Sequence, residues 1–496
     1  MENPDSSAVS SHLGLGLGAA LCSGLLLLPV PEGLSPAAWR TAAVGALMAV
    51  WWITEALPIA ATALVPLVAF PLLGIRGIDE AAAPYANPLI FLFMGGFLLA
   101  QAMQAWGLHR RIALGIVQAV GTRPRSIVIG FILASAFLSM WVSNTATALM
   151  MLPIGVSIVE LARDRLAARG ETLSPRFGIV LALSIAYACN IGGMGTLIGT
   201  PPNALLAGFF SESYGVEIGF AQWMGVGLPL VGVALPLLYG VLTWVYPLER
   251  DTLPGGEEII DEERARLGPF STAELRVAVV FGGTALLWMA RPILREAVPG
   301  LSDAGIAMGA GLVLFLLPAG TDDRALLGWE EAEALPWGVL VLFGGGLSLA
   351  AAIRDTGLAE WMGRGVGALQ HWPVGLVVVA TVALVVALTE ITSNTATTAA
   401  FLPILGAVAV GLGESPYLLA VPAALGASCA FMLPVATPPN AIVYGSGLLT
   451  IPEMSRVGVW LNLLFIGVVT VLAYGLLGVA FGVELGSVPP WAVGAG

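Results

Sequence analysis

Residues 143–147 read Ser-Asn-Thr-Ala-Thr, and residues 393–397 repeat the same five residues at an offset of 393 − 143 = 250. Each copy is followed five residues later by a Leu-Pro pair. Both copies lie in the middle of long apolar stretches, where polar groups are costly in lipid unless they bind something. Two copies of one polar cluster therefore predict a single binding site built from two halves of the chain.

The composition predicts an integral membrane protein. Hydrophobic residues make up 57% of the 496 residues and charged residues only 10%, unlike soluble globular domains. Backbone groups in lipid must be satisfied within their own segment, so an all-α fold is expected. The three cysteines and three histidines have no metal or catalytic spacing. Neither an enzyme nor a nucleic-acid-binding protein is expected.

Apolar runs long enough to cross a bilayer predict about eleven transmembrane helices. They fall at 13–31, 39–57, 59–75, 86–104, 177–210, 222–246, 276–291, 303–318, 336–352, 415–449 and 458–483. Two further stretches, 126–161 and 373–412, are too long for one helix and too short for two complete spans, and the Ser-Asn-Thr phrase bisects each. We expect these two stretches to form re-entrant hairpins.

Arginines on both sides of the first hairpin indicate its orientation. Arg123 precedes it and Arg163 follows it, so the positive-inside rule places both flanks in the cytoplasm. Tracing the spans onward makes the second hairpin enter from outside, which predicts inverted repeats. The chain then lies in the inner membrane with a cytoplasmic N-terminus and an external C-terminus. On this trace Arg291 and Arg295 fall outside, against the rule.

The offset of 250 also relates Gly95-Gly96 to Gly345-Gly346 and suggests how the chain is divided. Amphipathic helices at the membrane interface are expected at 105–122 and 353–370. The expected parts are an N-terminal helix (1–38), repeat 1 (39–250, with hairpin 126–161 and broken helix 177–210), a cytoplasmic connector (251–275), repeat 2 (276–483, with hairpin 373–412 and broken helix 415–449) and a tail (484–496).

A second motif pair predicts that two of the spans are broken. Thr-Pro-Pro-Asn occurs at 200–203, inside 177–210, and again at 437–440, inside 415–449. A proline pair removes two backbone donors, whereas Thr followed by Pro suits a helix start with Thr as the N-cap. Helices that start in the middle of the membrane present unpaired N–H groups and a positive dipole end, which favour anions.

The charges of these segments favour coupled transport. Neither the two hairpins nor the two broken spans contain Arg, Lys or His, and their only acidic residues are Glu160 and Glu390. A multiply charged anion would therefore need co-bound cations, and backbone carbonyls with Ser, Thr and Asn oxygens suit a hard monovalent cation. For Glu390 a structural role is favoured, while a part in the second cation site or in proton transfer stays open.

These motifs, together with Trp-Trp-Ile-Thr-Glu-Ala-Leu-Pro at 51–58, resemble the divalent anion/sodium symporter family over nearly the whole chain. The resemblance implies a homodimer in which a transport domain slides as an elevator against a scaffold. It also implies that sodium ions are co-transported with the substrate. The substrate would be held between the two hairpin tips.

The resemblance further implies the residues of the site. The first sodium site would use Ser139, Ser143, Asn144 and Gly199, and the second would use Thr389, Thr392, Asn394 and Ala436. The substrate carboxylates would meet Asn144, Thr145, Asn394 and Thr395, with Thr200, Pro201, Thr437 and Pro438 completing the pocket.

The loops have no room for the large soluble insert of many sulfate-type relatives. This favours a C4-dicarboxylate such as succinate, fumarate or malate as the substrate. A sodium-independent dicarboxylate or citrate exchanger, or a sodium/citrate or sodium/sulfate symporter, remains an alternative on the same fold. An anion channel would need a continuous polar path instead of one site at the middle of the membrane.

Overall fold

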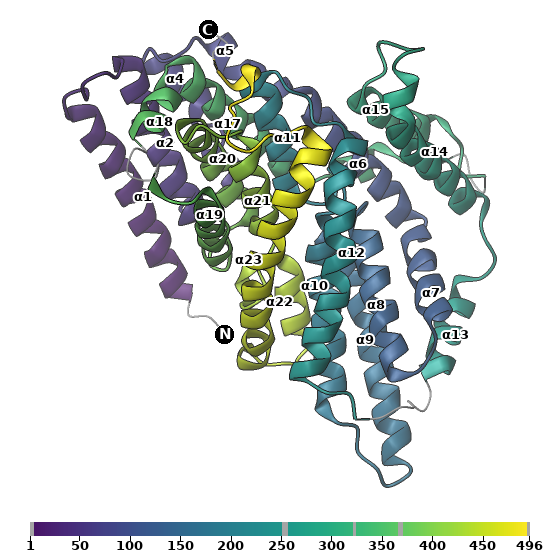
Figure 1. Ribbon diagram of the computed structural model, residues 1–496. Helices are drawn as coiled ribbons and strands as arrows, with labels where there is room; N and C mark the ends of the chain where they lie inside the picture. Colours follow the sequence, from purple (N-terminus) through teal and green to yellow (C-terminus); the bar gives the residue numbers. More distant parts are fainter. Residues whose placement is uncertain (1–3, 250–255, 321–323, 366–370, 494–496) are drawn as a thin grey trace.

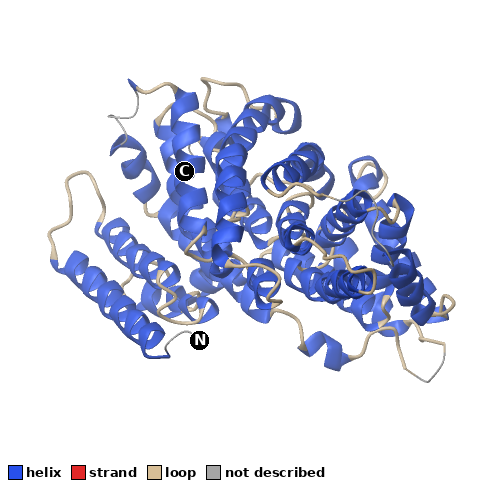
Figure 2. Ribbon diagram, turned by 90° about the horizontal axis from the view of Figure 1, so that it is seen from below, coloured by secondary structure: helices blue, strands red, loops and turns tan. Residues whose placement is uncertain are grey.

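The computed structural model describes residues 4–249, 256–320, 324–365 and 371–493, which fold almost entirely into helices (Figures 1 and 2). In these residues eight helices are long and apolar enough to cross a membrane, and six further apolar helices are shorter. The chain is therefore all-helical with many apolar helices. The count of eleven spans and the inversion of the repeats stay predictions, because length and composition alone do not show which helices cross.

The order of elements repeats within the chain. The first set consists of α6 (Pro88–Ala105), α7 (Leu108–Val120), α8 (Pro124–Ser139), α9 (Asn144–Ala167), α10 (Pro175–Gly193), α11 (Pro201–Tyr214) and α12 (Phe220–Val245). The second set consists of α17 (Trp337–Asp355), α18 (Leu358–Gly365), α19 (Val374–Thr389), α20 (Asn394–Gly411), α21 (Tyr417–Ala427), α22 (Pro438–Gly445) and α23 (Ile451–Phe481). Helices α8 and α19 correspond at the offset of 250 at both ends.

The remaining helices precede or separate the two sets. Before the first set come α1 (Pro4–Leu27), α2 (Pro36–Ile53), α3 (Ile59–Thr62), α4 (Val65–Leu72), α5 (Ile78–Ala82) and the 3₁₀ turn η1 (Ala83–Ala86). Between the sets lie α13 (Gly256–Leu267), α14 (Thr272–Leu294), α15 (Asp303–Leu316) and α16 (Trp329–Glu333). A 3₁₀ turn η3 (Pro434–Ala436) precedes α22, and η4 (Pro490–Ala492) lies in the tail.

Several boundaries differ from the sequence-based expectation. The stretch 59–75 forms two short helices, since Pro66 in the first turn of α4 favours a new helix start. The connector 251–275 contains helix α13, and α14 already starts at Thr272. There Ser271 and Glu274 form a capping box, with Ser271 Oγ accepting from Glu274 N at 3.1 Å. Part of 353–370 lies outside the described residues.

Helix α10 lies at the centre of the molecule. All of its residues from Phe177 to Gly193 are buried, as expected for a helix that is apolar all round. It packs against α8, α9, α12 and α22, and in Figure 1 it runs beside α8, α9 and α12 while α14 and α15 stand at one edge. The end of α10, where the chain breaks, is therefore enclosed by protein.

The repeated Gly-Gly pair allows two close helix contacts. A Cβ atom on Gly95 would lie 2.5 Å from the backbone carbon of Ala307 in α15, and one on Gly345 would clash with the carbonyl of Ala63. We expect Gly95→Ala and Gly345→Ala each to lower the free energy of unfolding by about 1–3 kcal/mol through overpacking. Thermal unfolding in detergent measures this. Gly309→Ala, with no heavy atom within 4 Å, is the control, and an equal loss there would contradict the argument.

Candidate functional site

The tip of the first hairpin joins two helices through a short turn. Helix α8 ends at Ser139 and α9 begins at Asn144, with Ser143 as the N-cap accepting from Ala146 N at 3.3 Å. The Ser139 hydroxyl donates to Asn144 Oδ1. Ser139 is buried, Asn144 and Thr145 are half-buried, and Ser143 is exposed. Three of the four residues assigned to the first sodium site thus lie at this tip.

The second hairpin has the same construction. Helix α19 ends at Thr389 and α20 begins at Asn394, with Ser393 as the N-cap accepting from Ala396 N at 3.4 Å. The Thr389 hydroxyl lies within hydrogen-bonding distance of Asn394 Oδ1, as Ser139 does of Asn144 in the first tip. Thr395 is half-buried.

The hydroxyl of Thr392 is engaged within its own hairpin. It donates to the carbonyl of Leu388 at 2.8 Å and lies 2.6 Å from the hydroxyl of Thr397. A role for Thr392 in the second sodium site would therefore use its backbone carbonyl.

Both long spans break before Thr-Pro-Pro-Asn. Helix α10 ends at Gly193 and α11 starts at Pro201, while α21 ends at Ala427 and α22 starts at Pro438. Both threonines are N-caps in extended backbone conformation, but only Thr437 uses its side chain, accepting from Asn440 N at 3.3 Å.

The pocket residues at the two breaks differ in exposure. Thr200 and Thr437 are buried, Pro201 is half-buried and Pro438 is exposed. Of the residues assigned to the sodium sites, Gly199 and Ala436 are both buried immediately before these threonines.

The first break lies directly against the first hairpin tip. A Cβ atom on Gly193 would lie 2.9 Å from Asn144 Oδ1 and 3.0 Å from the carbonyl oxygen of Gly199. Asn144 and Gly199 therefore both lie against Gly193, and Ser139 joins them through its hydrogen bond to Asn144. The sequence analysis did not single out Gly193. The available signal was the Gly-Gly pair at the end of the helix.

A methyl group at position 193 should disturb this cluster. We expect Gly193→Ala to raise the sodium concentration for half-maximal uptake by about tenfold, the lower range for loss of a supporting contact in a metal site. Uptake assays at varied sodium measure this. Gly232→Ala in α12, where no heavy atom lies within 4 Å, is the control. An unchanged sodium dependence in the Gly193 variant would show that the site lies elsewhere.

The two repeats interlock around the breaks. Helix α9 of the first hairpin packs against α22, and α20 of the second hairpin packs against α11. Asn190, near the end of α10, donates from Nδ2 to the hydroxyl of Thr437 at 3.2 Å. Each hairpin thus packs against the restarted helix of the other repeat, and Asn190 links the end of α10 to the start of α22. The role of Asn190 was not foreseen, since its partner is 247 residues away.

Glu390 anchors the second break to the second hairpin. Its side chain is 5% exposed and accepts hydrogen bonds from the backbone N–H groups of residues 431, 432 and 433 at 2.7–3.1 Å. The amide of Asn462 in α23 donates to it at 2.7 Å. Hydrogen bonds to a carboxylate are stronger than neutral ones, so this arrangement has a structural role of the kind favoured from the sequence.

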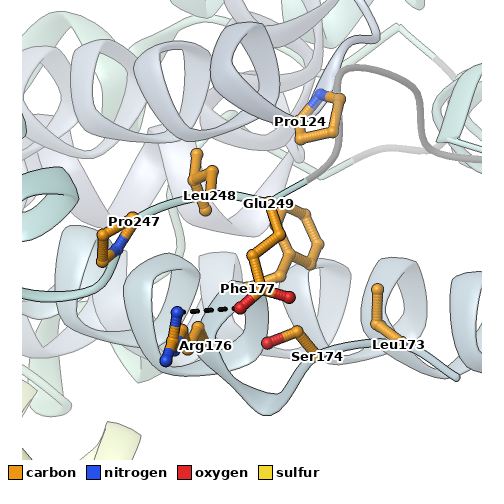
Figure 3. Close-up of a pocket in the computed structure, with 8 residues that line it drawn as sticks. All are labelled: Pro124, Leu173, Ser174, Arg176, Phe177, Pro247, Leu248 and Glu249. Atoms are coloured by element: carbon orange, nitrogen blue, oxygen red, sulfur yellow. Dashed lines mark hydrogen bonds and ion pairs between the residues drawn. The ribbon is translucent and has the colours of Figure 1, made fainter.

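One largely apolar pocket lies away from these residues. It is formed where the start of α8, the α9–α10 loop and the segment after α12 meet, and it includes about 310 Å³ of empty space (Figure 3). Its ion pair joins Arg176 Nη1 to Glu249 Oε1 at 2.8 Å. None of the predicted site residues lines this pocket.

Comparison with known proteins places the chain among membrane transporters. The family described as sodium:sulfate symporter transmembrane region matches residues 10–485. A Staphylococcus saprophyticus protein named sodium-dependent dicarboxylate transporter SdcS is 43% identical over 486 residues, covering 96% of this chain and 93% of the relative. The protein of the same name from Staphylococcus aureus USA300 is 42% identical over 480 residues, covering 95% and 92%.

Two solved structures share the fold. The Alcanivorax borkumensis YdaH transporter aligns with a TM-score of 0.58 at 16% identity, covering 96% of this chain and 98% of that one. Neisseria gonorrhoeae MtrF, described with a class of antimetabolite efflux pumps, aligns with a TM-score of 0.56 at 14% identity, covering 95% and 94%. At such identities the likeness concerns the fold alone.

Proposed function

This chain belongs to the sodium:sulfate symporter family, and from that premise we propose that it couples sodium entry to the uptake of C4-dicarboxylates such as succinate, fumarate or malate. The relatives that are 42–43% identical over nearly the whole chain are named for dicarboxylate, which favours dicarboxylate over sulfate. Sodium ions are co-transported cargo in this proposal.

One observation supports the proposal most directly. The helices that follow the two Ser-Asn-Thr tips pack against the restarted helices of the other repeat, and the two hairpins and two broken spans contain no Arg, Lys or His. A dicarboxylate bound there would have no side-chain cation to balance it. Sodium ions bound beside it would supply that charge, so binding of each ion would assist binding of the other.

In this proposal each half of the chain binds one sodium ion and contacts the substrate. The first sodium ion would be held by Ser139, Ser143, Asn144 and Gly199, and the second by Thr389, Thr392, Asn394 and Ala436. The substrate carboxylates would lie at the N-terminal ends of α9 and α20, next to Thr145 and Thr395, where unpaired backbone N–H groups favour negative charge. Thr200, Pro201, Thr437 and Pro438 would form the remaining walls.

The proposed transport cycle follows the family resemblance. The protein would act as a homodimer in the inner membrane, with two inverted repeats, a cytoplasmic N-terminus and an external C-terminus. The hairpins and broken helices would move together against the scaffold helices as an elevator. The interlocking of α9 with α22 and of α20 with α11 supports their movement as one body.

Uptake of radiolabelled succinate into proteoliposomes tests the proposal. We expect uptake with an inward sodium gradient and none when potassium replaces sodium. Equal uptake in both, requiring internal dicarboxylate, would instead identify a sodium-independent exchanger. If sodium drives uptake of citrate or sulfate but not of succinate, the protein is a citrate or sulfate symporter of the same family.

A further inference from the structure

Two asparagines hold the broken helices in the same way. Asn203, in the first turn of α11, donates from Nδ2 to the carbonyls of Gly193 at 3.1 Å and Thr196 at 2.8 Å. Asn440, in the first turn of α22, donates to the carbonyls of Ala430 and Leu433, both at 3.1 Å. In both breaks the accepting carbonyls lie ten and seven residues before the asparagine.

The two asparagines make the same hydrogen bonds although the residues that accept them differ. Gly193 corresponds to Ala430 and Thr196 to Leu433, so the accepting residues differ in type while the asparagine is the same. Gly193 ends α10, so its carbonyl has no donor within the helix, whereas Thr196, Ala430 and Leu433 lie in the breaks themselves. The asparagine amides donate to all four carbonyls. The backbone of the break is thereby tied to the start of the next helix.

Both asparagine side chains are fully buried and only half satisfied. Each is 0% exposed, and in the described part of the chain neither Oδ1 atom has a hydrogen-bond partner. A buried polar atom without a partner destabilises a protein, and a leucine of similar size would avoid that cost. The same costly residue at the same place in both breaks indicates that its two donated hydrogen bonds serve the site.

In the first break these hydrogen bonds lead to the hairpin tip. Asn203 holds the carbonyl of Thr196, and the Thr196 hydroxyl in turn donates to the carbonyl of Met140. Met140 directly follows Ser139, which contacts Asn144.

In the second break the connection uses different chemistry. Asn440 holds the carbonyl of Leu433, and Leu433 N donates to Glu390 Oε2 at 3.1 Å. Glu390 directly follows Thr389, which contacts Asn394. In both halves, hydrogen bonds thus connect the asparagine through the break to the residue that follows the first hydroxyl of the proposed sodium site, Ser139 in one half and Thr389 in the other.

We propose that Asn203 and Asn440 are positioning residues of the two sodium sites. By occupying the carbonyls ten and seven residues back, each fixes the course of the break and leaves the carbonyl of Gly199 or Ala436 to face its ion. This inference rests on the proposed function and extends it to residues that touch neither ion nor substrate.

Leucine variants test the inference in two ways. For Asn203→Leu and Asn440→Leu we expect the sodium concentration for half-maximal uptake to rise 10–100-fold, as for loss of a supporting contact in a metal site, while the succinate half-saturation at saturating sodium stays near the wild-type value. The purified variants should also lose most of the rise in melting temperature that sodium chloride gives over choline chloride. Ser184→Ala in α10 removes a buried hydrogen bond to Leu181 and should change neither measurement.

The results distinguish a failure of this inference from a failure of the proposed function. If the wild type depends on sodium and the folded leucine variants show the same sodium dependence, the inference is wrong and the proposed function stands. If sodium changes neither the uptake nor the melting temperature of the wild type, the proposed symport and the inference are both wrong. If the leucine variants do not fold, Asn203→Ser and Asn440→Ser, which keep one donor, are used in their place. A raised sodium concentration for half-maximal uptake in these variants supports the positioning role, and an unchanged one refutes it.

Discussion

Replacing Asn144 or Asn394 with alanine should reduce sodium-driven dicarboxylate uptake at least about 100-fold, the upper range for loss of a partner in a metal site. Each asparagine is assigned to a sodium ion and to a substrate carboxylate, so one substitution removes contacts to both. Each also holds the hydroxyl at the end of the preceding helix, Ser139 or Thr389. Uptake into proteoliposomes at saturating sodium and succinate measures the loss.

The same variants should remain folded. Both asparagines are half-buried, so truncation opens no large cavity, and their melting temperatures in detergent should stay close to that of the wild type. Asn87→Ala is the control, because it removes an N-cap outside the hairpins, where the cost is ~1 kcal/mol of stability, and should leave uptake intact. Wild-type uptake in both Asn144→Ala and Asn394→Ala would refute the assignment of the site.

Glu390→Leu should strongly destabilise the protein. The substitution leaves the N–H groups of residues 431–433 and the Asn462 amide without their acceptor in a buried place. Each unpaired buried donor costs ~1–3 kcal/mol, so a loss of at least ~3 kcal/mol in the free energy of unfolding is expected. A large drop in melting temperature in detergent measures it.

Two glutamine variants test whether the loss of stability comes from the Glu390 carboxylate or from any change of a glutamate. Glu390→Gln keeps one acceptor oxygen but turns amide donors toward backbone donors, so an intermediate loss is expected. Glu360→Gln, an exposed position in α18, should change nothing. A wild-type melting temperature for Glu390→Leu would mean that the loop after α21 has found other acceptors and that Glu390 does not anchor it.

The sequence by itself determined the class of the protein, its family and the residues at which the hairpin helices and the broken helices restart. The hairpin helices end at Ser139 and Thr389 and restart at Asn144 and Asn394, around the predicted Ser143 and Ser393 caps. These are local signals, because a capping serine or a Thr-Pro-Pro start acts within one turn of its own helix. The family followed from the same motifs and is confirmed by the match over residues 10–485.

The tertiary structure alone decided which of these local features meet. The bond from Asn190 to Thr437 joins residues 247 apart, and Glu390 reaches donors 41–72 residues away. Helices such as α10 and α21 are buried on every side, so their sequences have no polar face to show which neighbour each side will contact. The interlocking of each hairpin with the other repeat depends on the packing of whole helices, a long-range property that no short stretch of sequence encodes.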